Sequence, residues 1–491
     1  MYLGIDLGTS GLKVLLMDEA QTIIDNCTVP LDISHPRPLW SEQHPEDWWQ
    51  ATDKAVQLLK NRQAHALKQV RAISFSGQMH GAVLLDASGH VLRPAILWND
   101  GRAKIQCEEM LAREPQAWSI TGNLLMPGFT APKLSWVKTH EPDIFKQTAK
   151  VLLPKDYLRY RISGVFATDL SDASGTSWLD VGRRCWSKAM LAATDMDESY
   201  MPQLFEGNQI TGTILPAVAQ AWGMSEDVVL VAGAGDNAAS AVSMTITKPG
   251  EAFLSLGTSG VYFTADNCFR PNPEQGVHTF CHCLPNLWHE MTVHLSAASC
   301  LDWVAGIVGA DDLTELLHHV EQNEAEDVPI FLPYLSGERT PHNDPYARGV
   351  FFGMTHRTQP THLVQAVLEG VAFAFAQGQA AMKDAGVDIN HVSVVGGGAR
   401  NRYWGKILSA ALQQALCYNQ DADVGAAYGA ARLAWLGMHE KADPSEVFAP
   451  AKLLYSIMPE TRRVEHYQQR QQLFNELYCQ LKSVFNKAYK R

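Results

Sequence analysis

Short apolar runs alternate with glycine-rich turns along the chain, and the same pentapeptide separates two such pairs of runs. LGTSG occurs at Leu7 to Gly11 and again at Leu256 to Gly260, each time between apolar segments that predict strands. Both copies therefore predict a β-hairpin with a tight turn. Such a turn exposes backbone N–H groups and two hydroxyls without bulky side chains, so a phosphate group can approach it closely. Two facing copies would hold one nucleotide between them.

Strands and helices alternate after each hairpin. A third strand is predicted near Thr22 to Val29, and apolar positions from Trp48 to Leu58 recur with helical spacing in a helix that ends near Asn61. Further strands are expected at Val70 to Phe75, before the SGQMHG loop, and in the AVLLD segment that follows this loop. The order of elements indicates an α/β sheet whose loops emerge together at one edge.

Each half also contains a strand, a glycine-rich turn and a helix. VVLVAGAGDN predicts a helix that opens at Asp236 or Asn237, and HVSVVGGGAR turns at Gly396 to Gly398 into another. With 491 residues, the chain exceeds the size of a single core, so at least two domains are expected. We place the boundary in TKPGE, giving domains at 1–247 and 248–491, the latter ending in a charged amphipathic helix from Arg462 to Tyr489.

Composition narrows the class of protein. Hydrophobic residues make up 46% and charged residues 19% of the chain, as in globular proteins, and we expect no membrane span. The chain enters a strand at once without a secretory signal, and its nine scattered cysteines fit reduced thiols, so a cytoplasmic location is expected. A formal net charge of −12 disfavours binding to nucleic acid.

Two aspartates are the main candidates for chemistry. The chain contains no G-x-x-x-x-G-K-[ST] phosphate loop and no G-x-G-x-x-G fingerprint. Asp6 ends the first strand, where its carboxylate could hold Mg²⁺ beside phosphates or bond its own turn. Asp236 in GAGDN could act as a catalytic base or as a helix N-cap. Lys13 could reach a phosphate or lie at the surface.

Other polar groups follow predicted strands. His80 in GQMHG and the LWNDGR segment, with Trp98, Asn99, Asp100 and Arg102, could bind a polyhydroxylated ligand, although each alone is more often structural. The glycines at 396–398 could let adenine or ribose lie against the backbone, or could simply form a loop. The cluster of His278, Cys281, His282 and Cys283 lacks a second pair of ligands at zinc-finger spacing, so zinc is disfavoured.

Taken together, these segments resemble the FGGY family of carbohydrate kinases, and most closely its members that phosphorylate xylulose. GFTAPKLSWVKTH (Gly128 to His140) and GVFFGMTHRTQPTHLVQAVLE (Gly349 to Glu369) fit the two long signatures of the family. GQMHG, LWNDGR, GAGDN and YLSGERTPH (Tyr334 to His342) are similar to its sugar-site and cleft segments. The resemblance covers nearly the whole chain. It implies two actin-like, ribonuclease H-type domains with the active site in the cleft between them.

The resemblance also implies a set of site residues. By this mapping Thr9, Ser10 and Lys13 form the first phosphate segment, Gly257, Thr258 and Ser259 the second, and Gly397, Gly398 and Asn401 the adenosine site. Met79, His80, Trp98, Asp100, Asp236 and Asn237 would meet the sugar, with Asp236 as base and Asp6 as the Mg²⁺ ligand. The implied reaction is transfer of the γ-phosphoryl group of ATP to the 5-hydroxyl of D-xylulose.

Two rival functions stay open. A related kinase for ribulose, gluconate or glycerol would share the nucleotide residues and differ around Met79, His80 and Trp98. An actin-like filament protein or chaperone ATPase would share the fold but would hydrolyse ATP without a sugar. Dimers are common in the kinase family, so by analogy a homodimer is possible, and the sequence leaves the oligomeric state open.

Overall fold

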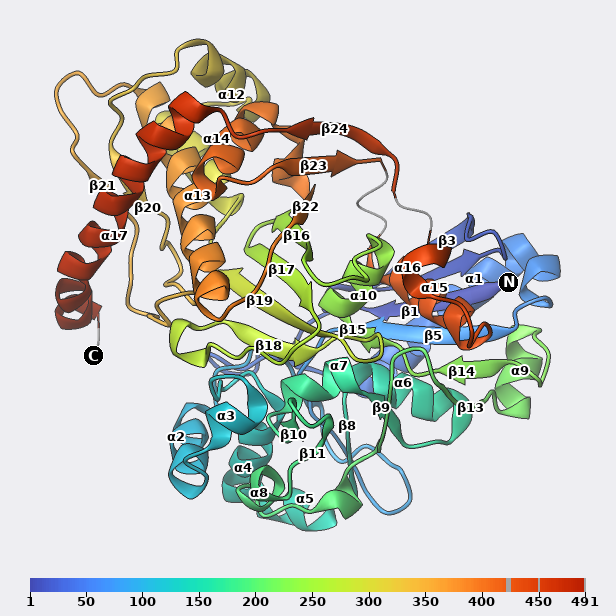
Figure 1. Ribbon diagram of the computed structural model, residues 1–491. Coiled ribbons are helices and arrows are strands. Elements are labelled where there is room, and N and C mark those ends of the chain that lie inside the picture. Colours follow the sequence, from blue (N-terminus) through green and yellow to red (C-terminus); the bar gives the residue numbers. More distant parts are fainter. Residues whose placement is uncertain (421–424, 449–450, 490–491) are drawn as a thin grey trace.

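Two seven-stranded sheets organise the protein, a computed structural model that describes residues 1–420, 425–448 and 451–489 (Figure 1). The strands of the N-terminal sheet are β1 (Tyr2–Leu7), β2 (Gly11–Met17), β3 (Ile23–Pro30), β5 (Ala72–Gly77), β13 (Ile210–Thr213), β14 (Val229–Val231) and β15 (Ala234–Gly235). Those of the C-terminal sheet are β16 (Glu251–Leu256), β17 (Gly260–Asp266), β18 (His278–Cys281), β19 (Trp288–His294), β22 (His391–Val395), β23 (Leu416–Asn419) and β24 (Leu453–Ile457).

The two sheets repeat one pairing pattern. The order β3-β2-β1-β5-β14-β13 has two antiparallel, two parallel and one antiparallel pairing, and β19-β17-β16-β22-β23-β24 has the same series. This is the ribonuclease H-type, actin-like topology that the resemblance implies, and the predicted α/β class is confirmed. Internal duplication therefore extends from the pentapeptide to the whole sheet.

Both predicted hairpins form, but their turns close differently. The last paired residues are Leu7 with Leu12 in the first hairpin and Leu256 with Gly260 in the second, which makes the second turn one residue tighter. Asp6 lies opposite Lys13, whereas the corresponding part of the second hairpin pairs Ser255 with Val261. Only the first copy therefore adds a pair of charged side chains to its turn.

Helices surround both sheets, and short strand pairs lie in the connections. The helices are α1 (Pro45–Leu67), α2 (Lys104–Arg113), α3 (Ala117–Thr121), α4 (Thr130–His140), α5 (Pro142–Gln147), α6 (Pro154–Ser163), α7 (Leu170–Ala173), α8 (Lys188–Ala192), α9 (Pro216–Trp222), α10 (Asp236–Ser243), α11 (Ser299–Val308), α12 (Leu313–Gln322), α13 (Pro360–Asp384), α14 (Arg402–Leu412), α15 (Ala426–Gly437), α16 (Pro444–Val447) and α17 (Thr461–Tyr489). The short pairs are β4 (Glu42–Gln43) with β7 (Ala95–Ile96), β6 (Val83–Leu85) with β8 (Lys150–Leu152), β12 (Gln203–Phe205) with β9 (Ala167–Asp169), β10 (Leu179–Asp180) with β11 (Cys185–Trp186), and β20 (Ile330–Leu332) with β21 (Val350–Phe352).

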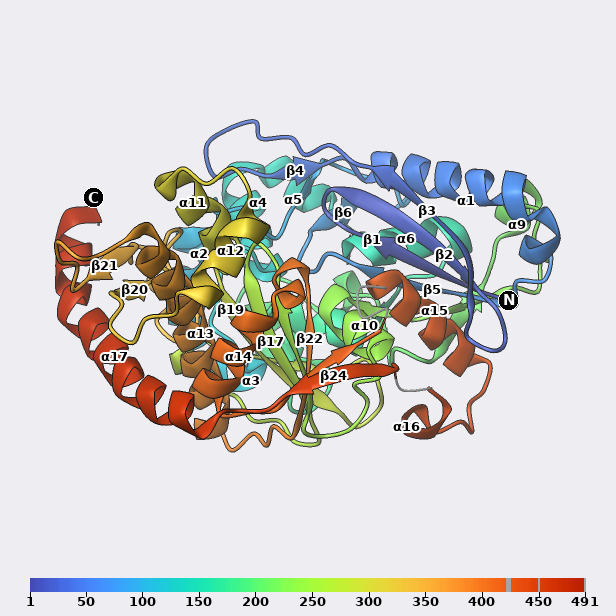
Figure 2. The same ribbon diagram turned by 90° about the horizontal axis from the view of Figure 1, so that it is seen from above.

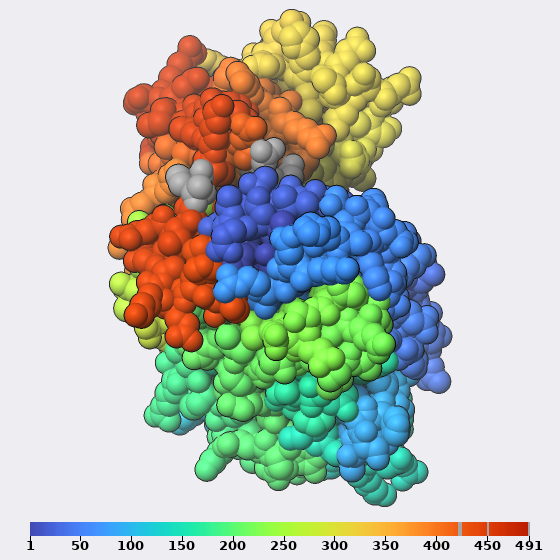
Figure 3. Space-filling model, turned by 90° about the vertical axis from the view of Figure 1, so that its right-hand side faces the viewer, coloured from blue at the N-terminus to red at the C-terminus, as the bar shows by residue number. Residues whose placement is uncertain are grey.

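One helix of the second half packs on the first sheet. α15, which we expected in the C-terminal domain, covers β1 and β5 and packs against α10, and its orange-red residues lie against blue N-terminal residues in Figure 3. A Cβ at Gly4 would come within 2.0 Å of the Ala427 carbonyl oxygen, so this close approach needs glycine. The expected domain boundary between residues 247 and 248 stays a prediction. α15 comes after this boundary in sequence but packs on the sheet that comes before it. Both views place α10 between the two sheets (Figures 1 and 2).

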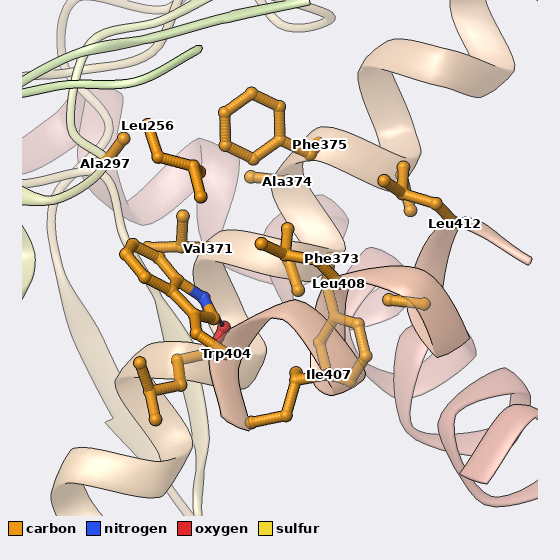
Figure 4. Close-up of a cluster of buried hydrophobic side chains, with 14 of the residues drawn as sticks. Leu256, Ala297, Val371, Phe373, Ala374, Phe375, Trp404, Ile407, Leu408 and Leu412 are labelled. Atoms are coloured by element: carbon orange, nitrogen blue, oxygen red, sulfur yellow. Dashed lines mark hydrogen bonds between the residues drawn. The ribbon is translucent and has the colours of Figure 1, made fainter. Parts of the chain in front are cut away.

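The core of the C-terminal half connects its sheet to the helices around it. Leu256, at the end of β16, shares this core with Trp404 of α14 and Phe375 of α13 (Figure 4). The predicted C-terminal helix is confirmed as α17, which buries Tyr467 and Phe474 in the same core. The residues that precede the second turn are thus fixed by packing.

Two bulk properties can be read from the structure. No helix in the described ranges combines the length and the apolar character that crossing a bilayer demands. All nine cysteines lie within the described residues and carry free thiols.

Candidate active site at the ends of β1, β5 and β15

Three neighbouring strands bring the two predicted aspartates to one sheet edge. β5 runs parallel to both β1 and β15, with Asp6 opposite Ser76 and Gly235 opposite Gly77. Asp236 follows Gly235 directly and begins α10. Parallel strands end at the same edge of a sheet, which is where ligands bind in open α/β folds. Residues that are 230 positions apart in sequence therefore share one site.

The environment of Asp236 makes it a stronger base than a free carboxylate. Burial, together with the negative charge of Asp6, raises the pKa of Asp236 to about 7, and hydrogen bonds from Asn237 oppose the shift. The Asn237 backbone N–H and side-chain amide donate to Asp236 Oδ1 at 2.8 and 3.0 Å. Gly235, not Asp236, is the N-cap residue of α10, so the capping alternative is wrong. The neighbouring residue Asn237 thus donates two hydrogen bonds that hold this carboxylate at the helix start.

A buried cluster of polar and charged side chains holds the turn at Gly235 in place. The Gly235 N–H donates to Ser171 Oγ at 3.1 Å, and the Ser171 hydroxyl in turn donates to Asp169. Lys155 Nζ lies 2.6 Å from the same Asp169, and its ammonium and this carboxylate are fully buried. Sequence reasoning missed these residues, although an Asp at a helix start, here the N-cap of α7, is a recognisable signal. They hold the peptide that immediately precedes Asp236.

Asp6 offers an unsatisfied oxygen at the same edge. Burial raises the pKa of Asp6, whereas the Ser76 hydroxyl and the Lys13 ammonium lower it. Among the described residues, no donor bonds its buried Oδ1 atom. A buried carboxylate oxygen without a donor is costly, and a hydrated cation would satisfy it. The alternative that Asp6 bonds its own turn has no support in this geometry.

Predicted nucleotide residues from distant segments of the chain line one cavity in the C-terminal half. Gly257, Thr258, Gly397, Gly398 and Asn401 line one pocket of about 630 Å³. A Cβ at Gly398 would meet the Trp404 ring at 2.6 Å, so this position requires glycine. Sequence reasoning missed its outer wall, which consists of Leu301 and Asp302 of α11 and Leu313, Thr314 and Leu317 of α12. Amphipathic helices give no local signal that distinguishes a pocket wall from ordinary packing.

Asn401 and Ser259 differ from the other predicted nucleotide residues. Asn401 caps α14, because its Oδ1 accepts a hydrogen bond from the Trp404 backbone N–H at 2.8 Å. Its amide nitrogen is then the group that would contact a ribose or a base. Ser259 is exposed in the second turn, and Ser10 is exposed in the first.

Of the predicted sugar residues, Met79 contacts the turn that precedes Asp236, and His80 follows Met79 in sequence. Met79 packs under the turn, since a Cβ at Gly235 would lie 2.9 Å from Met79 Sδ. The His80 ring stacks on Phe129 with centroids 4.3 Å apart, and its Nδ1 lies 2.7 Å from the Gly175 carbonyl oxygen. Burial lowers the pKa of His80 to about 3. Because a carbonyl only accepts, the neutral ring has its proton on Nδ1 and presents Nε2 as an acceptor.

Trp98 and Asp100 follow β7 but differ in their surroundings. Trp98 is 46% exposed, and its indole N–H donates to Thr9 Oγ1 at 3.0 Å. Asp100 is buried, and its oxygens accept hydrogen bonds from the Ser41 backbone N–H and from the Arg102 backbone and guanidinium. Its predicted contact with sugar stays a prediction, and its structural role is to fix the LWNDGR loop.

The histidine and cysteine segment begins in β18, which contains His278 and Cys281 and lies at the contact between the halves. His278 Nδ1 lies 2.9 Å from Asn123 Oδ1, and its Nε2 lies 3.5 Å from a nitrogen of Arg339 in the GERTPH segment. The positive charge of Arg339 is one cause that keeps the pKa of His80 low, after burial. In the described part of the chain, no three His, Cys, Asp or Glu residues are arranged to hold a metal ion.

Comparison with known proteins finds the family that the sequence motifs resemble, over nearly the whole chain. The profile for the FGGY family of carbohydrate kinases, N-terminal domain, matches residues 1–243, and that for the C-terminal domain matches 252–438. A xylulose kinase from Escherichia coli (strain K12) is 52% identical, with 98% of this chain and 99% of the relative covered. One from Bacillus subtilis (strain 168) is 35% identical, with 98% and 97% covered. The crystal structure of a xyloylose kinase from Brucella ovis matches with a TM-score of 0.94 at 46% identity, covering 98% and 99%.

Proposed function

The chain belongs to the FGGY family of carbohydrate kinases, and from this premise we propose that it transfers the γ-phosphoryl group of ATP to the 5-hydroxyl group of D-xylulose. The curated relatives at 52% and 49% identity are both named xylulose kinase. The observation that carries the proposal is the Asp236 carboxylate, whose pKa is raised to about 7 beside Asp6 and the Met79–His80 segment.

Asp236 would take the proton of the attacking hydroxyl. A base works best when its pKa lies near the working pH, and such proton transfer contributes roughly 10² to 10⁴ in rate. The hydrogen bonds from Asn237 hold Asp236 Oδ1, which leaves Oδ2 for the substrate hydroxyl. His80 Nε2 and the Asn237 amide would orient the remaining hydroxyl groups of the pentulose.

The two hairpin turns would hold the phosphates of ATP. Their backbone N–H groups and the Lys13 ammonium provide donors, while the pocket beside Gly397 and Gly398 accepts the adenosine. The apolar side chains of Leu301, Leu313 and Leu317 would pack on the base. Phosphoryl transfer depends mainly on alignment and charge neutralisation, which this arrangement provides.

The residues at the C-terminal end of β1 fit a magnesium ion. The unsatisfied Asp6 Oδ1 is a hard oxygen ligand of the kind that Mg²⁺ takes, directly or through water. When bound, Mg²⁺ neutralises charge on the phosphates. Asp6 would hold the ion near the phosphate turn and thereby keep the nucleotide in register with Asp236.

A sugar panel tests the proposed reaction. Purified protein is incubated with ATP and D-xylulose, D-ribulose, L-ribulose, gluconate or glycerol, with and without Mg²⁺, and ADP release is measured. We expect the highest kcat/KM with D-xylulose and turnover only with Mg²⁺. A higher kcat/KM for gluconate or glycerol identifies a related kinase, whereas ADP release without any sugar supports the ATPase class.

Substitution of Asp236 tests its role as base. Asp236→Ala and the isosteric Asp236→Asn should each lower kcat by about 10² or more while MgADP still binds, because a general base is lost but the phosphate turns remain. Steady-state kinetics and calorimetric titration with MgADP give the two readouts. Near-normal turnover in either variant removes Asp236 from the mechanism.

A further inference from the structure

The hydroxyl of Thr9, in the first phosphate turn, bonds residues of the sugar side. Thr9 Oγ1 donates to Gln78 Oε1 at 3.0 Å and accepts from the Trp98 indole N–H at 3.0 Å. A threonine hydroxyl has a single proton, so it has none left to donate to a phosphate oxygen. In this arrangement, Thr9 can donate to a phosphate only through its backbone N–H.

Two buried glutamines complete the network behind Thr9. Gln78 Nε2 donates to Gln43 Oε1 at 3.0 Å, and Gln43 Nε2 donates to the Thr9 carbonyl oxygen at 2.8 Å. Gln43 is 4% exposed and Gln78 is 3% exposed, so solvent competes little for these bonds. The turn is therefore held through both its side chain and its backbone.

The same network reaches both predicted sugar segments. Gln78 immediately precedes Met79 and His80, and its backbone N–H donates to the Leu7 carbonyl oxygen at 2.8 Å. The Trp98 ring is 46% exposed, and its N–H is the group that bonds Thr9. A sugar that contacts this ring or the His80 segment moves groups that are bonded directly to the phosphate turn.

Within the described residues, the second copy of the pentapeptide has no such connection to the sugar side. Thr258 is exposed and lines the nucleotide pocket, and its turn is held through backbone oxygens that accept from Ala297 and Ala298. Turns with the same sequence therefore have different surroundings. One is tied to the sugar side, and the other faces the nucleotide.

We propose that Thr9 and its partners Gln78 and Trp98 are positioning residues that couple sugar binding to nucleotide binding, whereas Thr258 contacts the nucleotide directly. This inference rests on the proposed kinase function. Sugar bound against Trp98 and His80 stabilises the turn geometry that receives the phosphates. Occupancy of the sugar site then raises the affinity for nucleotide through the Thr9 hydroxyl.

Calorimetric titration with MgADP, with and without saturating D-xylulose, tests the coupling without turnover. In the wild-type protein, sugar should lower the Kd for MgADP by about 5-fold or more, a typical coupling between sites. Thr9→Val replaces the hydroxyl with a methyl group, and Trp98→Phe removes the indole N–H together with part of the ring, so both should bring the ratio of the two Kd values toward one. Thr9→Ser keeps the hydroxyl and should retain the ratio.

Thr258→Val is the matched control in the second turn. It should weaken MgADP binding by the same factor in both conditions, so the ratio keeps its wild-type value. A wild-type ratio in Thr9→Val, or a ratio of one in the wild-type protein, overturns the inference. Circular dichroism and thermal unfolding confirm that each variant is folded.

Turnover by the wild-type protein separates this inference from the proposed function. Absence of D-xylulose phosphorylation overturns the proposed substrate, and the titrations are then made with whichever sugar of the panel is phosphorylated. Phosphorylation of D-xylulose together with an unaltered ratio in Thr9→Val overturns the coupling alone.

Discussion

The two aspartates of this site differ in chemistry because their surroundings differ. Asp6 and Asp236 have the same side chain, but Asp6 faces Lys13 across a hairpin while Asp236 opens a helix beside a second negative charge. Burial acts on both pKa values, and only Asp6 has a cation beside it to oppose the shift. The two residues are thereby suited to different tasks, Asp6 to bind a cation and Asp236 to accept a proton.

The raised pKa of Asp236 predicts an acid limb in the rate profile. Below a pH of about 7 the carboxyl group is protonated and accepts no proton, so kcat/KM should fall tenfold per pH unit, and above it the rate should level off. Mg²⁺ held by Asp6 would add positive charge to the site and would therefore move the limb to lower pH. Kinetics of D-xylulose phosphorylation between pH 5 and 9 measure the limb.

Asp6→Asn provides the control for this profile. Removing the negative neighbour should lower the pKa of Asp236 and move the limb of the residual activity to lower pH, whatever the loss in maximal rate. A limb at the same pH in Asp6→Asn, or one above pH 8 in the wild-type protein, contradicts the assignment.

At this scale, sequence reasoning found the residues that end strands and missed those that support them. Asp6 and Asp236 each precede or follow a glycine-rich turn, which is visible in a linear sequence. Ser171 and Lys155 act on Asp236 through Gly235, from two other helices, α7 and α6. Such contacts depend on packing between segments, and no local pattern of residues encodes them.

Among the elements, α15 connects the halves most closely. It begins after Gly425, lies across β1 and β5, and packs on α10, which opens with the catalytic candidate. Gly429 allows this contact, because a Cβ there would come within 1.8 Å of the Ala239 carbonyl oxygen. Arg432 adds a polar link by donating to the Val242 and Ser243 carbonyl oxygens at the end of α10.

Replacing Gly429 should therefore separate α15 from α10. Gly429→Ala forces backbone atoms apart and should cost about 2 kcal/mol or more of stability, together with a loss of turnover as Asp236 shifts. Gly306→Ala is the matched control, since a Cβ at that helical position meets nothing within 4 Å. It should leave stability unchanged or raise it by up to about 1 kcal/mol. Thermal unfolding of both variants measures the difference, and equal stabilities contradict a close helix contact.

The sequence predicted which elements exist better than where they pack. Hairpins, the α10 segment and α17 have strong local signals, namely glycine turns or amphipathic spacing. The GAAYGAARLAWLG segment shows a small-residue helix that can pack closely, which is correct, but its partner is not encoded in its own residues. α15 therefore packs on the N-terminal sheet, although its residues fall within the predicted domain 248–491.

Across the whole molecule, the two halves are joined at β18 as well as through α10 and α15. The Asn123 amide donates to the Thr279 carbonyl oxygen at 2.8 Å, and the Cys281 N–H donates to Ser174 Oγ at 3.0 Å, so β18 is bonded to the N-terminal half. Phe129 and Phe280 add an apolar contact beside these bonds. We expect these contacts, together with those of α10 and α15, to be kept when one half moves toward the other.

Sugar binding should draw the halves together while these contacts are kept. Water competes with the sugar as a phosphoryl acceptor, and closure over a bound sugar excludes it from the site. Small-angle X-ray scattering should therefore show a lower radius of gyration with D-xylulose and MgADP than with either ligand absent. Glycerol with MgADP is the control and should leave the radius at its value for MgADP alone. A radius of gyration that is the same in every ligand state contradicts closure. In that case, water would have to be excluded from the site without movement of the halves, by side chains such as Trp98 and His80.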